Sequence, residues 1–359
     1  MPFTPSTHPG LIHRYTRRLI AFEYFPPSSS SSPSNPTSAI SPNPPSLPVG
    51  SPPPHRNLLL WLGGLGDGLL TVTYPSTLAA ALPTNWTLIQ PLLRSSYQGW
   101  GTGSLEGDVE DLEKCVGYLR GVYGRCRVVV MGHSTGCQVG LRYCMSLARS
   151  AEGKGEGPHT QDEGDKENHI QALILQAPVS DREALLLLQG PTAYTGSIQL
   201  AQRFIHDGRP HDCLPTSATA GFFPTPVSAT RWLSLASPPP DHTGADDLFS
   251  SDFSKERLRG TFGRLARLRP RVPVCVLYSG EDEFVPREVD KVALVGRWEE
   301  VVREAGGGWD GVNGGVVEGA SHNMETDGEG VVAELVRRTV GFLERVERGG
   351  WGAGTRLCF

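Results

Sequence analysis

The chain is 359 residues long, with 38% hydrophobic residues, 20% charged residues and a formal net charge of −5. These values are ordinary for a globular protein with a sizeable core. The negative charge provides no basic surface for nucleic acid or an anionic membrane, and no apolar run approaches the roughly 20 residues that span a bilayer. We therefore predict no nucleic-acid partner and no membrane span.

The N-terminal residues and the cysteines bear on location. His and Arg side chains are frequent in residues 8–18, but no apolar segment of about 7–15 residues follows them, as a secretory signal would require. The seven cysteines are scattered and form no Cys-x-x-Cys pair, which argues against a disulfide framework or a zinc site. We expect a reduced, cytoplasmic protein without a bound metal.

Segments with strand and helix patterns alternate along the chain. In chain order they are 11–24 (one or two strands), 58–62 (strand), 86–90 (strand), 108–123 (helix), 128–131 (strand), 138–148 (helix), 170–175 (strand), 272–277 (strand), 289–304 (helix), 315–317 (strand) and 330–346 (helix). Most of the strands are continuous apolar runs, and the helices between them are amphipathic. This pattern predicts an α/β fold in which helices cover both faces of a mostly parallel sheet.

Three segments interrupt this alternation. Residues 26–54 are rich in Ser and Pro, and residues 150–168 are rich in Gly and charged residues. Such compositions cannot bury a core, so we predict disordered insertions there. Residues 181–268 are helix- and Pro-rich and lie between two core strands, which predicts a cap over the carboxyl ends of the strands. The predicted organisation is a core of 1–180 and 269–347, a cap or lid of 181–268 and a tail of 348–359.

The sequence Gly-His-Ser-Thr-Gly at 132–136 matches the G-x-S-x-G motif. In a Gly-rich chain the match alone is weak, and a Gly-rich turn with a solvated serine is the alternative. However, a predicted strand precedes the motif and a predicted helix follows it, as a nucleophile elbow requires. Gly132 and Gly136 leave room for such a sharp turn. We predict that Ser134 is the nucleophile.

A supporting acid is expected in a loop after a later strand. Glu281, Asp282 and Glu283 all follow the predicted strand 272–277. The Asp-x-x-Val-Pro spacing favours Asp282 as the acid, which leaves the two glutamates as solvated turn residues.

The base is expected to be a histidine between the last strand and the last helix. Of the ten histidines, only His322 lies in such a place. His133 adjoins the nucleophile in sequence, but on an elbow its side chain should point into the core. The order Ser134, Asp282, His322 is the chain order of the α/β-hydrolase fold.

An oxyanion hole needs two backbone N–H groups that point at the developing negative charge. One is expected from Thr135, the residue after the nucleophile. The other is expected from Leu65, with Gly64 as the next choice, because Gly-Gly-Leu-Gly-Asp-Gly at 63–68 follows an early strand. A phosphate-binding Gly loop is the alternative, but no Walker lysine follows this segment.

Seven segments of the sequence together carry a resemblance to a known protein family. They are His-Arg-Tyr at 13–15, the Gly-rich segment 63–68, Ser-Ser-Tyr-Gln-Gly-Trp-Gly at 95–101, the motif region 132–138, Gln-Ala-Pro-Val-Ser-Asp-Arg-Glu at 176–183, Asp-Leu-Phe-Ser-Ser-Asp at 247–252 and the acid loop 279–286. In these segments the chain resembles the fungal and plant α/β-hydrolase family called DUF1749. The resemblance implies the α/β-hydrolase fold, with Ser134, Asp282 and His322 as nucleophile, acid and base. The family includes fungal esterases that hydrolyse fusarinine-type ferric siderophores inside the cell.

The expected function is that of a serine esterase that forms an acyl-enzyme and needs no cofactor. The resemblance implies a fusarinine-type siderophore as the small-molecule ester substrate, in intracellular iron release. The alternatives are a general carboxylesterase, lipase or thioesterase with the same triad, and a non-catalytic hydrolase-fold binding protein. Asp181 and Arg182 are expected at the mouth of the site, where they either fix the cap through an ion pair or contact the substrate. The sequence makes no prediction of oligomeric state.

Overall fold

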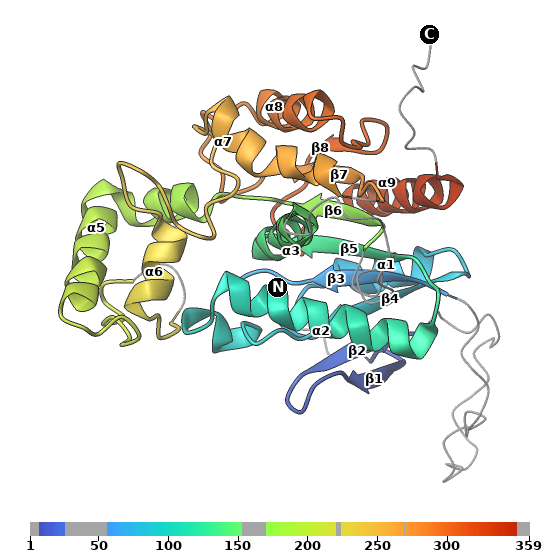
Figure 1. The fold of residues 1–359 in the computed structure, drawn as a ribbon, viewed down its shortest axis with the longest axis horizontal. Coiled ribbons are helices and arrows are strands. Elements are labelled where there is room, and N and C mark those ends of the chain that lie inside the picture. The colour runs from blue at the N-terminus through green and yellow to red at the C-terminus, as the bar shows by residue number, and fades with distance from the viewer. Residues whose placement is uncertain (1–6, 26–55, 153–169, 220–223, 269, 350–359) are drawn as a thin grey trace.

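The computed structural model describes residues 7–25, 56–152, 170–219, 224–268 and 270–349 (Figure 1). Eight strands form one sheet in the order β1-β2-β4-β3-β5-β6-β7-β8. The strands are β1 (Gly10–Arg14), β2 (Ile20–Tyr24), β3 (Asn57–Leu62), β4 (Trp86–Pro91), β5 (Val128–His133), β6 (Ala172–Gln176), β7 (Val274–Ser279) and β8 (Gly315–Val317). β1 and β2 pair antiparallel at one edge, and the pairs from β4 to β8 are parallel. The sheet is therefore mostly parallel, as predicted.

Alternate residues of the central strands enter two different cores. In β3, Leu58 and Leu60 lie in the core on one face, whereas Leu59 and Trp61 lie in the core on the other face. The same alternation holds along β5, β6 and β7. Because both faces of the sheet are buried, these strands are continuously apolar. Their apolar runs are the feature from which the sequence predicted them.

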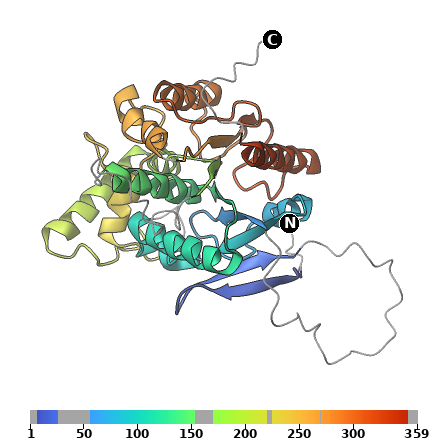
Figure 2. The ribbon, with the colours of Figure 1, turned by 45° about the vertical axis from the view of Figure 1, so that its right-hand side comes forward.

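Helices cover both faces of the sheet (Figures 1 and 2). The helices are α1 (Tyr74–Ala81), α2 (Leu105–Tyr123), α3 (Thr135–Glu152), α5 (Asp181–His206), α6 (Ala229–Ala236), α7 (Lys255–Gly260), α8 (Lys291–Glu304) and α9 (Glu329–Arg348), with 3₁₀ turns η1 (Tyr97–Gly101) and η2 (Phe262–Arg267). Side chains of α2, α3 and α8 fill the core on one face, and side chains of α1 and α9 fill the other. Helix α1 was not predicted, because eight residues with a proline in the first turn show too little of a helical period.

Helices α5 and α6 stand apart from the sheet, at the left of Figure 1. They share their own apolar cluster, which includes Leu185, Ile198 and Trp232. Helix α5 is interrupted at Gly190, which has a φ of +73° and precedes Pro191. We call these two helices the cap.

The predicted cap boundary at residue 268 differs from the structure. Phe249, Phe262 and Leu265 belong to the sheet core rather than to the cap cluster. Phe262 and Phe249 lie against Trp298 of α8, at ring-centroid distances of 5.1 and 5.6 Å. Residues 248–268 therefore return to the core, although no strand among them marks that return.

The predicted disordered insertions lie almost wholly outside the described residues. Only residues 150–152 of the second insertion are described, and they end helix α3. Within the described ranges, no helix is both long and apolar enough to cross a membrane.

Candidate active site

Ser134 occupies the sharp turn between β5 and α3. Its φ is +52°, in the left-handed region that side chains rarely adopt. The turn is crowded: a Cβ on Gly132 would lie 2.4 Å from the carbonyl carbon of Gly136, and a Cβ on Gly136 would lie 2.4 Å from the Leu62 oxygen. The Ser134 N–H also donates to the Gln176 carbonyl of β6, at 3.1 Å. The motif is therefore a strained elbow, in the geometry of a hydrolase nucleophile.

His322 lies between Ser134 and Asp282. Its Nε2 is 2.8 Å from Ser134 Oγ, and its Nδ1 is 2.8 Å from Asp282 Oδ2. Asp282 follows β7 and His322 follows β8, so adjacent parallel strands deliver both residues to one edge of the sheet. The Phe284 ring packs edge-on against the imidazole at 4.8 Å. The structure thus brings together the three residues that the sequence predicted as nucleophile, acid and base.

The two glutamates beside Asp282 have different surroundings. Glu281 is exposed and its carboxylate makes no hydrogen bond with the described residues. The Glu283 carboxylate accepts the backbone N–H of His322 at 2.9 Å. Glu283 therefore holds the histidine loop, a contact that its position in a run of acidic residues did not indicate.

His133, which precedes Ser134, is buried in the core, as predicted. Its ring stacks on Trp61, with centroids 5.8 Å apart and an interplanar angle of 13°. Nδ1 lies 2.5 Å from Gln176 Oε1, which also accepts the Tyr74 hydroxyl at 3.0 Å. Burial, followed by the neighbouring His322, lowers the pKa of His133 from 6.5 to about 4. His133 is therefore a neutral imidazole at neutral pH.

Two backbone N–H groups beside Ser134 have no hydrogen-bond partner among the described residues. They belong to Leu65, in the turn after β3, and to Thr135, at the start of α3. By contrast, the Gly64 N–H donates to Asp67 Oδ2 at 2.7 Å. Of the three predicted oxyanion donors, Leu65 and Thr135 are therefore free and Gly64 is engaged.

A cavity of about 760 Å³ opens above Ser134, between the core and the cap. Ser134, His322 and Phe284 line it from the core, and Ala184 and Leu188 line it from α5. Its exposed lining is mostly apolar. A cavity of this size and character is typical of a small-molecule site. Among the described residues, no group of His, Cys, Asp or Glu is arranged to hold a metal ion.

Asp181 lines this cavity, but Arg182 does not. The Asp181 carboxylate accepts the Gln138 side-chain amide at 2.9 Å. Burial, followed by the charge of Asp246, raises the pKa of Asp181 well above its usual value. Of the predicted pair, Asp181 is therefore the member that lines the cavity, with a buried carboxylate that Gln138 holds.

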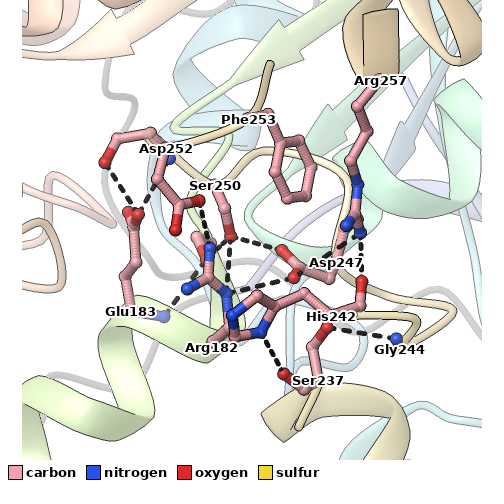
Figure 3. Close-up of polar contacts among 12 residues, drawn as sticks. Arg182, Glu183, Ser237, His242, Gly244, Asp247, Ser250, Asp252, Phe253 and Arg257 are labelled. Carbon is pink, nitrogen blue, oxygen red and sulfur yellow. Dashed lines mark hydrogen bonds and ion pairs between the residues drawn. The ribbon is translucent and has the colours of Figure 1, made fainter. Parts of the chain in front are cut away.

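Arg182 instead joins α5 to residues 247–252 (Figure 3). Its Nε donates to Asp247 at 3.1 Å and to Ser250 at 3.2 Å, and its Nη2 contacts Asp252. Next to it, Glu183 accepts both the N–H and the hydroxyl of Ser251 at 2.8 Å. We call this set the clasp; it comprises Arg182, Glu183, Asp247, Ser250, Ser251 and Asp252. Arg182 therefore makes ion pairs that fix the cap, which was one of the two roles predicted for it.

Solved structures share this architecture. An α/β-hydrolase-fold protein of unknown function, 17% identical in sequence, superposes with a TM-score of 0.58 over 96% of this chain and 98% of that chain. The fold and the elbow thus define an α/β-hydrolase. Residues 3–344 match the family described as protein of unknown function (DUF1749), and the chain belongs to this family.

Several similar proteins have named activities. An esterase of Emericella nidulans is 36% identical, over 94% of this chain and 93% of its own. The fusarinine C esterase of Aspergillus fumigatus is 35% identical, over 93% of this chain and 95% of its own. The structure of the siderophore hydrolase EstB from Aspergillus fumigatus superposes with a TM-score of 0.71 at 34% identity, over 96% of this chain and 99% of that chain.

Proposed function

We propose that this chain is a serine esterase that cleaves carboxylic esters through an acyl-enzyme. The observation that carries the proposal is the hydrogen-bonded series from Ser134 Oγ through His322 to Asp282, at the floor of a cavity. A serine hydroxyl is a weak nucleophile unless a base accepts its proton, and an imidazole at 2.8 Å is placed to accept it.

The reaction proceeds in two steps. His322 removes the Ser134 proton as Oγ attacks the ester carbonyl, and Asp282 stabilises the imidazolium that forms. The free N–H groups of Leu65 and Thr135 stabilise the oxyanion. The imidazolium then protonates the departing alcohol, and a water activated by His322 releases the acyl group.

The proposed substrate class is the fusarinine-type siderophore. Two relatives at 34–35% identity over more than 90% of this chain are named a fusarinine C esterase and a siderophore hydrolase. The cavity of about 760 Å³ has room for a substrate larger than a short acyl ester. Iron would arrive with the substrate.

The test is hydrolysis of ferric and iron-free fusarinine-type siderophores, followed by mass spectrometry, with short p-nitrophenyl esters in parallel. Ser134→Ala should lower kcat on every substrate by at least about 10⁴-fold, because the nucleophile is lost. Cleavage of the simple esters alone would retain the mechanism and reject the siderophore, in favour of a general carboxylesterase.

Covalent labelling provides the control. A fluorophosphonate should label the wild type and fail to label Ser134→Ala. Labelling that persists in the variant, or that never occurs in the wild type, would reject Ser134 as the nucleophile.

A further inference from the structure

The turn that supplies the Leu65 N–H is closed by its own aspartate. Residues 64–67 form a β-turn in which the Asp67 N–H donates to the Gly64 carbonyl at 3.1 Å. Gly66 occupies the third position with a φ of +85°, as a type II turn requires. The Asp67 carboxylate then returns across the turn and accepts the Gly64 N–H at 2.7 Å. Two hydrogen bonds therefore connect Gly64 and Asp67, the two ends of the turn.

Further contacts hold Asp67 itself in place. Its Oδ1 accepts the Thr71 hydroxyl at 3.1 Å, and its carbonyl accepts the Tyr97 N–H at 2.8 Å. Gln90 of β4 donates to the next carbonyl, that of Gly68, at 2.8 Å. Asp67 therefore joins the turn to Thr71 and to Tyr97.

The turn lies directly against the proposed nucleophile. A Cβ on Gly64 would be 2.7 Å from Ser134 Cβ and 3.2 Å from Ser134 Oγ. A rotation of the Gly64–Leu65 peptide would therefore move the Leu65 N–H relative to the reacting atoms. The Asp67 N–H holds the carbonyl of that peptide, and the Asp67 carboxylate holds the N–H of the preceding Gly63–Gly64 peptide. Together they fix the turn and leave the Leu65 N–H as its free donor.

An ion pair with His133 does not account for Asp67. The His133 Nε2 is 3.9 Å from Asp67 Oδ2, too far for a hydrogen bond. The His133 Nδ1–H donates to the side-chain oxygen of Gln176, and the lowered pKa of His133 keeps the ring neutral. The hydrogen bonds of the carboxylate therefore go to its own loop.

We propose that Asp67 is a positioning residue that orients the oxyanion-binding turn, so that the Leu65 N–H faces the tetrahedral intermediate formed on Ser134. This inference rests on the proposed esterase function. It assigns a role to Asp67, for which the sequence of the Gly-rich segment 63–68 indicated none.

The test compares Asp67→Asn with Asp67→Ala. The asparagine oxygen can still accept the Gly64 N–H, and its amide can donate to the Thr71 hydroxyl, so this variant should retain kcat within a few-fold. Asp67→Ala keeps the backbone hydrogen bond of the turn but frees the Gly64 N–H. It should lower kcat on the order of 10- to 100-fold with little change in KM, because the oxyanion exists only after attack. Thr71→Val is the matched control: it removes the hydrogen bonds of the Thr71 hydroxyl to Asp67 and Gly68 and leaves the Gly64 contact in place. It should lower kcat less than Asp67→Ala does.

Rates are expressed per active site, counted by the endpoint of fluorophosphonate labelling. The affinity for a trifluoromethyl ketone, which forms an oxyanion on the enzyme, should fall in parallel with kcat. A loss confined to melting temperature, with kcat per site and ketone affinity unchanged in Asp67→Ala, would overturn the proposal and leave a purely structural turn. An inactive wild type would instead reject the proposed function.

Discussion

Two histidines with ring centroids 5.1 Å apart differ in chemistry because their partners differ. His322 lies between a carboxylate and a hydroxyl, so it is placed to accept the hydroxyl proton. His133 lies between an indole ring and an amide oxygen in the protein interior. The residue type is the same, and the surroundings decide which one is placed to act as a base.

This difference predicts how stability depends on pH. The pKa of His133 falls from 6.5 in the unfolded chain to about 4 in the folded protein, so only the unfolded chain binds its proton between these values. Folding stability should therefore decrease as the pH falls from 6.5 towards 4, by about 2–3 kcal/mol at pH 4.5. Urea denaturation of the wild type and His133→Asn at pH 7 and pH 4.5 measures the effect. The variant should lose less stability between the two pH values, and equal losses would contradict the assignment.

At the scale of elements, the cap is joined to the core through the clasp. Arg182 and Glu183 begin α5, and residues 247–252 are held in turn by Arg297 of α8, which donates to the Ser251 carbonyl at 2.7 Å. The same first turns of α5 carry Asp181 and Ala184 into the cavity. The clasp therefore fixes one wall of the cavity, although no clasp residue lines it.

The clasp predicts unequal costs for its two ion pairs. The Asp247 side chain is 0% exposed, so Arg182→Met leaves a buried carboxylate without its closest cation and should cost about 3–5 kcal/mol of folding stability. The Asp252 side chain is 56% exposed, so Asp252→Asn should cost about 1 kcal/mol or less. Chemical denaturation of both variants measures these values. Similar costs for the two substitutions would show that the Asp247 contact is not the stabilising one.

At the scale of the whole molecule, the site exists only where the cap meets the core. Ser134 and His322 come from the edge of the sheet, and Leu188 comes from α5. Ser134, Asp282 and His322 belong to the core, so their mutual geometry is set at the edge of the sheet. The space between the core and the cap limits the size of the substrate that the site can accept.

Two adjacent leucines on α5 test whether the cap limits the size of the substrate. Leu187 and Leu188 are both substantially exposed, but only Leu188 lines the cavity. Leu188→Ala should raise KM for a large siderophore ester about 3- to 10-fold, because part of its apolar contact is lost, and should leave p-nitrophenyl acetate unaffected. Leu187→Ala should change neither. Steady-state kinetics with both esters decides, and equal effects of the two substitutions would place the large substrate elsewhere.

Features that depend on neighbours along the chain could be predicted from the amino-acid sequence. Continuous apolar strands, amphipathic helices and the glycines around Ser134 are local patterns, so the parallel sheet and the elbow could be predicted from them. The order of Ser134, Asp282 and His322 then followed from the strands that each residue succeeds.

Features that depend on residues far apart in the chain became visible only in the folded protein. It selected Asp282 from three adjacent carboxylates, sent Arg182 to the clasp rather than the cavity, and returned residues 248–268 to the core. It also assigned Glu283 to the loop of His322. Composition and spacing carry no such information, because a side chain's partner is set by which surfaces meet when the sheet, the helices and the cap pack together.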